Sequence, residues 1–351
     1  MNIDDIDTPA ILIDLDRVEA NLARAQAYAD GHGFALRPHI KTHRLPDFAR
    51  RQVELGAKGI TCQKLGEAEV MADAGLTDIL ITFNIFGPAK LDRLAVLHDR
   101  IRIAVVTDNA TVTEGYAARF TNADHPLDVM VECDTGAGRN GVQDAGQALA
   151  MARQIVAAPG LRFRGLMTYP PKDAKATGEW LADAKRVIEQ AGIAVPEVSS
   201  GGSPTLYSAH ETESMTEYRP GTYIYSDRMQ VAAGLGTLED CALSVLMTVV
   251  SLPTETRAVL DGGSKALAAD LCAAPGHGHI VEYPDAIVAK LSEEHAVVDL
   301  SACADKPQVG ARVRVIPNHV CVVSNLFDKV HLMRGTVVEE VLNVAARGRS
   351  N

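Results

Sequence analysis

The sequence predicts a (β/α)8 barrel followed by a separate domain made mainly of β-strands. Between about residues 35 and 225, eight short apolar runs alternate with amphipathic segments, the pattern of parallel strands that are each followed by a helix. After about residue 235, strand-like runs follow one another with turn residues between them and little helical pattern. We therefore expect an α/β barrel over residues 12–232 and a β domain formed by residues 1–11 and 233–351.

The expected barrel strands are continuous apolar or β-branched runs, as in strands that are buried on both faces. In chain order they are FALRPHI, GITCQ, DILITFN, IRIAVVTD, LDVMVECD, FRGLMTYP, EVSSGG and EYRPGTYIY. The segments between them have apolar residues three and four positions apart, as in LPDFARRQVELG, AGQALAMARQIVAA and GEWLADAKRVIEQAG. The strand count favours the barrel, and an open doubly wound sheet is the alternative architecture.

The β domain is expected to contain five longer strand regions after the barrel. They are ALSVLMTVVSLP, TRAVLDGG, HAVVDL, ARVRVIPNHVCVV and KVHLMRGTVVEEVLNV. The segment TPAILIDLD near the N-terminus is a further candidate strand for this domain, and DRVEANLARAQAYADG is the helix expected to lead into the barrel.

Composition and charge exclude several classes of partner. The formal net charge of −11 argues against nucleic acid or an anionic membrane as the main partner, but it leaves room for a local basic pocket. The chain contains no apolar run of about 18 residues and no basic segment at its acidic N-terminus, so we expect neither a membrane span nor a signal peptide. Six scattered cysteines without a CxxC pair are typical of reduced thiols in a cytoplasmic protein.

Candidate functional residues follow the expected strands, where barrels collect their active sites. Lys41 lies just past the first strand, Arg139 just past the fifth, and Tyr169 ends the sixth. Two glycine-containing loops, residues 199–203 and 219–223, offer hydroxyl and backbone N–H groups where barrels often bind phosphate. A lysine together with a phosphate site suggests pyridoxal 5'-phosphate (PLP), whereas Lys41 considered alone is more readily a solvated or structural cation.

These segments resemble the D-threonine aldolase and D-serine dehydratase family, whose members share the alanine-racemase type of PLP fold. The resemblance runs in order along nearly the whole chain, through TPAILIDLDRVEANL, RPHIKTHRLP, GITCQKLGEAE, VECDTGAGRNGV, SSGGSPT, YRPGTYIYSD, VLDGGSKAL, LSEEHAVV, PNHVCVVSNL and AARGR. It implies a PLP-binding barrel, a β domain that carries a metal motif, a homodimer with sites near the subunit interface, and a divalent metal beside the cofactor.

The resemblance also implies the roles of individual residues. Lys41 would be the Schiff-base lysine, and Arg219 resembles the arginine that racemases of this fold aim at the pyridine nitrogen. A guanidinium cannot accept the ring proton, so it would leave that nitrogen unprotonated and weaken the ring as an electron sink. The other expected cofactor-binding residues are Arg139, Tyr169, Ser200, Gly201, Gly202, Gly221, Thr222 and Tyr223.

His319 and Cys321 form the candidate metal pair. They are two positions apart in PNHVCVV, and on a strand both side chains would point to the same face. Imidazole with thiolate suits zinc and would tolerate manganese less well, and magnesium is a further possibility. An HxC pair alone is weak evidence, but the family carries its metal ligands at this motif. Two protein ligands leave positions for water and substrate.

The implied substrate is a D-amino acid with a hydroxyl group on its β-carbon. Retro-aldol cleavage would give glycine and an aldehyde, whereas β-elimination would give a 2-oxo acid and ammonia. Overall resemblance favours the D-threonine-aldolase type. Cys321 favours the D-serine or D-threo-3-hydroxyaspartate dehydratase type, because aldolases of the family more often carry HxD. Two remoter alternatives are an amino-acid racemase, suggested by Arg219, and a non-catalytic PLP carrier, which would usually lack the β domain.

One position departs from the family pattern. The histidine that usually follows the tyrosine ending the sixth strand is Pro170 here. If that histidine is the base, another group must replace it, and His43 and His295 are the candidate catalytic residues, with His210 as a third. His295 lies within SEEHAVV and is favoured as a residue contributed by a partner subunit, with a purely structural histidine as the alternative.

Overall fold

The computed structural model describes residues 2–170 and 173–351 and separates into two compact units. The barrel unit comprises Ala25–Lys41, Pro46–Gly221 and Arg349–Asn351. The β unit comprises Met1–Arg24, Thr42–Leu45 and Thr222–Gly348. Helix α1 (Leu15–His32) belongs to the β unit as far as Arg24 and to the barrel unit from Ala25 onward. No helix of the described residues is long and apolar enough to cross a membrane.

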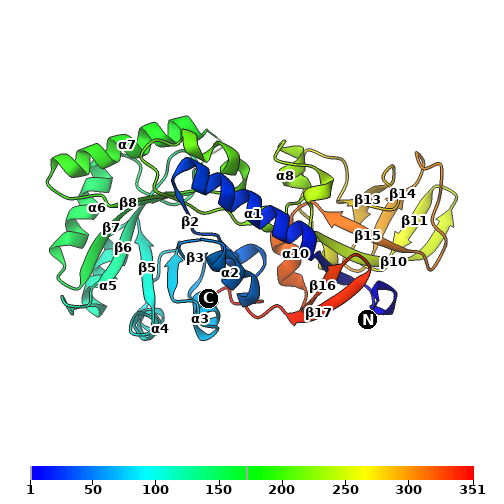
Figure 1. Cartoon of the computed structure of the whole chain (residues 1–351), viewed down its shortest axis with the longest axis horizontal. Helices are drawn as coiled ribbons and strands as arrows, with labels where there is room; N and C mark the ends of the chain where they lie inside the picture. Colours follow the sequence, from blue (N-terminus) through cyan, green and yellow to red (C-terminus); the bar gives the residue numbers. More distant parts are fainter. Residues whose placement is uncertain (1, 171–172) are drawn as a thin grey trace. The chain divides into compact units, whose positions relative to one another are not determined.

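The barrel unit is built on an eight-stranded parallel sheet with the order β2-β9-β8-β7-β6-β5-β4-β3 (Figure 1). A parallel bridge between His39 and Thr61 joins its two edges, so the sheet closes on itself. The predicted barrel is therefore confirmed, and the alternative, an open doubly wound sheet, is not what forms. The strands are β2 (Ala35–Leu36), β3 (Ile60–Cys62), β4 (Asp78–Ile81), β5 (Arg102–Thr107), β6 (Leu127–Cys133), β7 (Leu161–Thr168), β8 (Glu197–Ser200) and β9 (Glu217–Tyr218).

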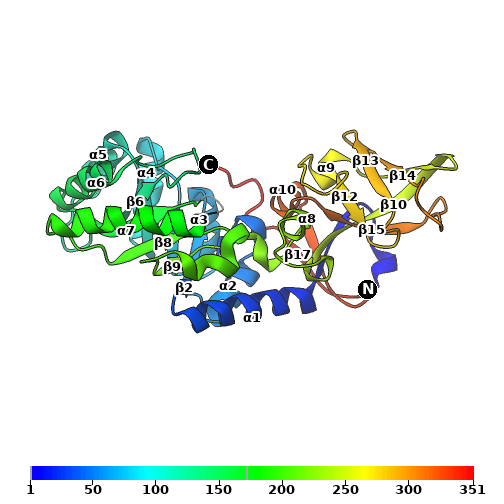
Figure 2. The same cartoon turned by 90° about the horizontal axis from the view of Figure 1, so that it is seen from above.

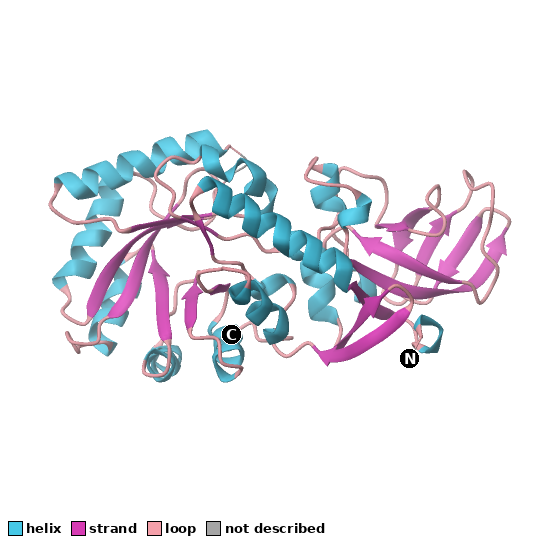
Figure 3. Ribbon diagram, viewed as in Figure 1, coloured by secondary structure: helices cyan, strands magenta, loops and turns pink. Residues whose placement is uncertain are grey.

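The helices of the barrel unit lie outside this sheet (Figures 1 and 3). They are α2 (Pro46–Glu54), α3 (Leu65–Asp73), α4 (Pro88–His98), α5 (Ala110–Arg119), α6 (Ala145–Ala157) and α7 (Ala174–Gln190). Helix α6 illustrates why they form. The Asp144 side chain accepts a hydrogen bond from Gln147 N at its start, and Ala148, Ala152 and Ile155 form the buried face at spacings of four and three.

Apolar side chains from four neighbouring strands form one core cluster of this barrel. Leu80, Ala104, Val106, Met130 and Met167 pack together, each at most 1% exposed. They come from β4, β5, β6 and β7. Because alternate residues of a strand point to the same face, Glu132, two positions after Met130 in β6, points to the same face as this cluster.

A buried ion pair lies at the amino ends of the barrel strands. Arg37 is fully buried, and its guanidinium lies 2.6 Å from the Asp78 carboxylate and 2.7 Å from that of Glu217. Burial alone would raise the pKa of Glu217, but Arg37 outweighs burial and holds the pKa below its usual value. Each buried charge therefore depends on its partner, because an unpaired charge in this environment is costly.

The β unit is built on a nine-stranded sheet in which β10 has a central place. The strands are β1 (Ala10–Asp14), β10 (Leu243–Thr254), β11 (Arg257–Leu260), β12 (Gly278–Ile280), β13 (Ile287–Leu291), β14 (Ala296–Asp299), β15 (Arg312–Pro317), β16 (Lys329–Arg334) and β17 (Val337–Asn343). Strand β10 pairs with both β11 and β15, so six strands from β10 to β15 close into a ring, part of which is visible in Figure 2.

Strand β1, from the N-terminal segment, lies within the sheet of the β unit. It pairs antiparallel with β10 and parallel with β16. Strand β17 then pairs antiparallel with β16 and ends the sheet. Residues at the two ends of the chain therefore complete one sheet.

Two predicted strands are longer than the strands that form. The segment EYRPGTYIY forms a strand only over β9, because Pro220 has no N–H for the ladder and a 3₁₀ turn, η4 (Thr222–Ile224), follows. The segment PNHVCVV is not a strand. Strand β15 ends at Pro317, His319 is the N-cap of helix α10 (Val320–Leu326), and Cys321 lies in the first turn of that helix.

Candidate active site

Lys41 follows the first barrel strand, as predicted, in the 3₁₀ turn η2 (Ile40–Thr42). Its side chain is partly exposed, and its backbone N–H donates to Nδ1 of His39 at 3.3 Å. Arg139 and Tyr169 follow β6 and β7, and the structure brings them together. The guanidinium carbon of Arg139 lies 4.6 Å from the centre of the Tyr169 ring, a cation–π contact.

The loop after β8 has the features of a phosphate cradle. Gly201 has a φ of +135°, and a Cβ there would lie 2.5 Å from Arg219 N, so only glycine fits. Gly221 N donates to Ser203 Oγ at 3.1 Å and ties the second loop to the first. Ser200 is fully buried, and its Oγ has no hydrogen-bond partner among the described residues. An unpaired buried hydroxyl beside glycines fits a phosphate oxygen.

Tyr169 also packs against this loop. A Cβ on Gly202 would lie 3.2 Å from Cε2 of Tyr169, so the ring passes close to the loop backbone. The Gly202 carbonyl accepts a hydrogen bond of 2.7 Å from the Tyr218 hydroxyl, which holds the loop from the other side. Arg139, Tyr169 and the cradle thus form one cluster at the carboxyl ends of the strands.

Arg219 is held inside the barrel by contacts with two neighbouring strands, β7 and β8. Its guanidinium donates to Ser199 Oγ and to the Thr168 carbonyl, both at 2.6 Å, and contacts Met167 Sδ at 3.2 Å. Burial lowers the pKa of Arg219 to about 10, against the opposing charges of Glu217 and Glu132. The group therefore remains a cation at neutral pH.

Glu132 is a buried acid that sequence reasoning did not single out. It lies near the carboxyl end of β6, is 1% exposed, and its Oε2 has no hydrogen-bond partner among the described residues. Burial raises its pKa to about 7, although Arg139 and Arg219 favour the charged form. The available signal was an acid near the end of the largely apolar segment LDVMVEC, because a buried acid normally needs a partner.

The predicted metal pair, His319 and Cys321, lies in the β unit with a partner that the sequence analysis missed. Nδ1 of His319 lies 2.8 Å from Oδ2 of Asp227, which is fully buried. A histidine that donates Nδ1–H to a carboxylate presents Nε2 to a metal, the usual arrangement of metal-binding histidines. Burial lowers the pKa of His319, but hydrogen bonds with Asp227 and Cys321 outweigh it and raise the pKa to about 10.

Cys321 is partly exposed and lies among hydroxyl groups. Its Sγ lies 3.1 Å from Thr42 Oγ1 and 3.7 Å from Thr222 Oγ1. In each of these contacts either the hydroxyl or the thiol can be the donor. In the described part of the chain, no three His, Cys, Asp or Glu side chains are grouped to hold an ion. The imidazole of His319 and the thiol of Cys321 are of the ligand types that bind zinc.

Asp227 organises two helix starts as well as His319. Its Oδ1 caps helix α8 (Arg228–Ala232) by accepting from Gln230 N at 2.9 Å, and its Oδ2 accepts from Val320 N at 3.2 Å at the start of α10. This contact explains why PNHVCVV turns into a helix. The available signal was an aspartate at the end of YRPGTYIYSD, a common residue before a helix.

The two candidate bases lie in different surroundings within the β unit. His43 is 1% exposed, and its Nδ1 accepts a hydrogen bond of 3.1 Å from Leu45 N. His295 is exposed in the loop between β13 and β14, where its carbonyl accepts from Ser292 N at 2.9 Å. Tyr223, expected near the cofactor, is buried in η4. His210, the third candidate, belongs to the barrel unit, where its Nδ1 lies 2.5 Å from the Tyr28 hydroxyl.

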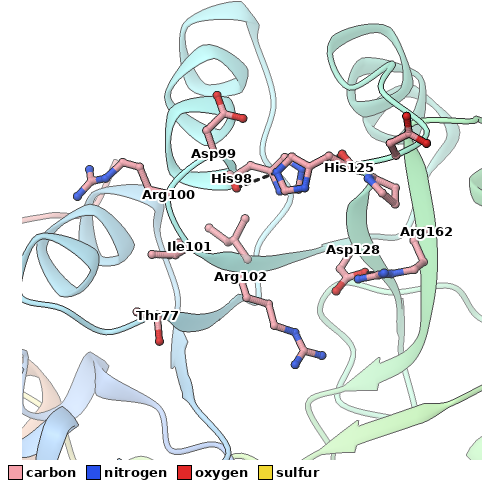
Figure 4. A pocket seen from close by; sticks show the side chains of 12 residues that line it. Thr77, His98, Asp99, Arg100, Ile101, Arg102, His125, Asp128 and Arg162 are labelled. Carbon is pink, nitrogen blue, oxygen red and sulfur yellow. Dashed lines mark hydrogen bonds and ion pairs between the residues drawn. The ribbon is translucent and has the colours of Figure 1, made fainter.

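A separate pocket of about 450 Å³ lies at the opposite, amino ends of β5, β6 and β7 (Figure 4). The rings of His98 and His125 stack there with centroids 4.0 Å apart, and Arg162 pairs with Asp128 at 2.5 Å. Three arginines and three aspartates line the pocket, so its charges balance. Active sites of such barrels lie at the carboxyl ends of the strands, so this pocket is not part of the candidate site.

Comparisons with known proteins agree with this architecture. Residues 13–229 match the family model "Alanine racemase, N-terminal domain", and residues 242–333 match "Putative serine dehydratase domain". The chain is 36% identical to a D-threonine aldolase from Arthrobacter sp. over 98% of this chain and 94% of that protein.

Two solved structures are similar over nearly their whole length. A D-threonine aldolase from Filomicrobium marinum superimposes with a TM-score of 0.91 at 31% identity, covering 99% of this chain and 97% of that one. A cysteine-to-alanine mutant of D-threo-3-hydroxyaspartate dehydratase in its metal-free form superimposes with a TM-score of 0.88 at 28% identity, covering 98% of each chain. The chain therefore belongs to the family built from an alanine racemase N-terminal domain and a serine dehydratase domain, whose relatives here are aldolases and dehydratases.

Proposed function

We propose that this protein is a PLP- and divalent-metal-dependent lyase of D-3-hydroxy amino acids, of the D-threonine-aldolase type. The observation that carries the proposal is the His319–Asp227 pair beside Cys321. A racemase or a PLP carrier has no need of a preformed metal-ligand pair, whereas a lyase that acts on a β-hydroxyl group does. The aldolase relatives support the same reaction type.

The barrel residues suit PLP. Lys41 would hold the cofactor covalently, and the unpaired Ser200 hydroxyl with the backbone of Gly201 and Gly202 would bind its phosphate. Gly221, whose N–H donates to Ser203 Oγ, would line the same cradle. When bound, PLP delocalises negative charge that develops at the substrate α-carbon. Arg139, held against Tyr169, would offer a cation to the phenolic oxygen of PLP. Thr222 and Tyr223 belong to the second loop and are further candidate cofactor-binding residues.

The β unit residues suit a divalent metal. His319 Nε2 and Cys321 Sγ would bind the ion, and Asp227 would fix the ring orientation and tautomer of His319. When bound, the ion acts as a Lewis acid on the carboxylate and β-hydroxyl group of the substrate. The thiolate ligand favours zinc over manganese or magnesium.

His295 of the partner subunit is the base that we favour, in a homodimer, and His43 of the same subunit is the alternative. Exposure of His295 supports a role across an interface, because a side chain at the surface of one subunit can reach another. Mixed dimers test this choice. Lys41→Ala subunits combined with His295→Gln subunits should regain about one quarter of wild-type activity if His295 acts in the partner's site, and none if it acts in its own.

The alternative reaction is β-elimination by a dehydratase, favoured by Cys321 and by the dehydratase relative. Purified protein with PLP and either Zn²⁺ or Mn²⁺ should be incubated with D-threonine and the products identified. Glycine with acetaldehyde establishes the aldolase. 2-Oxobutyrate with ammonia establishes the dehydratase. If the α-carbon only loses its chirality, and activity persists after chelation, the protein is a racemase and the lyase proposal is wrong.

A further inference from the structure

A line of hydrogen bonds leads from the backbone of Lys41 into the barrel wall. Lys41 N donates to Nδ1 of His39 at 3.3 Å, and Nε2 of His39 lies 3.1 Å from Oε1 of Gln63. Nε2 of Gln63 in turn donates to the Thr82 carbonyl at 2.8 Å. His39 is 7% exposed, so water competes little with these bonds. The line connects η2 to the residues that follow β3 and β4.

Each hydrogen-bond role in this line follows from the previous one. A backbone N–H can only donate, so Nδ1 of His39 must be an acceptor and a neutral ring carries its proton on Nε2. A carbonyl can only accept, so the Gln63 amide points its NH₂ group to Thr82 and its oxygen to His39. The Nε2–H of His39 then donates to that oxygen. All three side-chain roles agree, and the arrangement fixes one orientation of the His39 ring.

The backbone of this segment is anchored on both sides. His39 N donates to the Pro220 carbonyl at 2.9 Å, and Thr61 N donates to the Pro38 carbonyl at 2.8 Å. Pro220 directly precedes Gly221, the residue that binds Ser203 Oγ in the predicted phosphate cradle. The segment that carries Lys41 is therefore tied to the loop that would hold the cofactor phosphate.

We propose that His39 and Gln63 are positioning residues, which hold the backbone of Lys41 so that its amine keeps one position relative to the phosphate cradle. This inference rests on the proposed function, in which Lys41 holds PLP. His39 acts through the Lys41 backbone, and Gln63 acts one step further away by orienting His39. Loss of the Nδ1 acceptor therefore loosens η2, and loss of Gln63 has a smaller effect in the same direction.

A matched pair of variants separates the two ends of the His39 ring. In His39→Asn, the amide oxygen reaches roughly the place of Nδ1 and can still accept from Lys41 N. In His39→Gln, the longer amide reaches roughly the place of Nε2, keeps the contact with Gln63 and loses the acceptor. Backbone hydrogen–deuterium exchange of residues 40–42 should be measured in the full-length protein with and without PLP. We expect exchange about tenfold faster in His39→Gln, as loss of one hydrogen bond implies, and about unchanged in His39→Asn.

Borohydride trapping of PLP on Lys41, followed by mass spectrometry, gives the second readout. Trapping should be slower in His39→Gln than in both wild type and His39→Asn. Equal exchange and trapping in the two variants would overturn the inference. If His39→Gln does not fold, Gln63→Met replaces it, with faster exchange expected and wild-type exchange as the contrary result. Failure of wild-type protein to trap PLP at Lys41 would instead overturn the proposed function, so the two failures are distinct.

Discussion

The carboxylate of Asp227 lies 2.8 Å from Nδ1 of His319, although 92 residues separate the two in the chain. The same oxygen accepts the first N–H of α10, and the other oxygen caps α8. Both oxygens therefore act only as acceptors, and three N–H groups depend on them. This arrangement makes Asp227 the residue whose substitution is most informative about the metal site.

We expect Asp227→Asn to weaken zinc binding by about 10- to 100-fold, the usual effect of removing a carboxylate behind a metal-binding histidine. The asparagine side chain has one acceptor oxygen and one donor NH₂ group in place of two acceptor oxygens. At least one of the three N–H groups that Asp227 accepts would then face a donor. Competition with a chromophoric chelator measures the affinity, and far-UV circular dichroism controls for the two helices. Unchanged zinc affinity in a folded variant would contradict a metal role for His319.

Replacement of Cys321 by aspartate should change the metal preference. A carboxylate oxygen is a harder ligand than a thiolate, so we expect Cys321→Asp to lower the ratio of zinc to manganese affinity by at least about tenfold. The ratio is measured by parallel titrations with the two metals. Cys321→Ala is the control, since it should weaken both metals. Identical ratios in wild type and Cys321→Asp would show that the thiol is not a ligand.

Removal of the Ser200 hydroxyl should leave the stability of the ligand-free protein unchanged or raise it, but should weaken phosphate binding. Without ligand, Ser200→Ala removes an unpaired buried polar group, so the free energy of unfolding should stay equal or rise by about 1 kcal/mol. With inorganic phosphate or PLP, the variant should gain less stability from the ligand than wild type does. Urea unfolding at several ligand concentrations measures both effects. A loss of stability without ligand would mean that the hydroxyl already has a partner.

Arg37 and Glu217 form a buried ion pair, so substitutions at the two positions should have strongly non-additive effects on the free energy of unfolding. Arg37→Met leaves the Glu217 carboxylate buried without its main cation and should lower the free energy of unfolding by about 3–5 kcal/mol. The double variant with Glu217→Met should recover part of this loss, because it removes the stranded charge. Urea denaturation of the two single variants and the double variant measures the coupling. Additive losses would show that the pair contributes no mutual interaction.

Glu132 should make stability fall as pH rises. Its pKa is about 7 in the folded protein, above the ordinary 4.5, so the folded state binds its proton more tightly than the unfolded state does. The resulting stabilisation is complete below about pH 4.5 and is lost as pH rises through 7, by about 3 kcal/mol in total. Urea unfolding of wild type and Glu132→Gln from pH 5 to 8 should give a difference that changes with pH. A constant difference would contradict a raised pKa.

Much of the fold follows from local pattern. The continuous apolar runs placed the eight barrel strands, and the spacing of Ala148, Ala152 and Ile155 predicted α6 to within a residue or two. The strand predicted at PNHVCVV failed because a carboxylate from Asp227, remote in sequence, caps the helix that forms there. Local propensity carries no information about such a partner, and only the folded chain supplies it.

The candidate site was likewise predictable only where the local sequence pattern was enough. The positions of Lys41, Arg139 and Tyr169 after barrel strands could be predicted, because the pattern of strands and helices is local. Their roles stay predictions. His39, Gln63, Asp227 and Glu132 were not singled out, since each matters through a neighbour that lies far away along the chain. Glu132 and Asp227 left weak local signals, an acid within an apolar run and an aspartate before a helix, but nothing in the sequence shows which groups they meet. His39 and Gln63 left no such signal.

The place of β1 has a consequence for how the chain folds during synthesis. All strands of the barrel sheet have been made once Tyr218 is added, whereas β1 lies between β10, which ends at Thr254, and β16, which ends at Arg334. Domains generally fold as they leave the ribosome. Strand β1 must therefore keep its apolar residues Ala10–Ile13 unpaired while the whole barrel is translated. Its first partner, β10, is complete only at Thr254, and its second partner, β16, only at Arg334, so the nascent chain carries an aggregation-prone apolar segment for most of its synthesis.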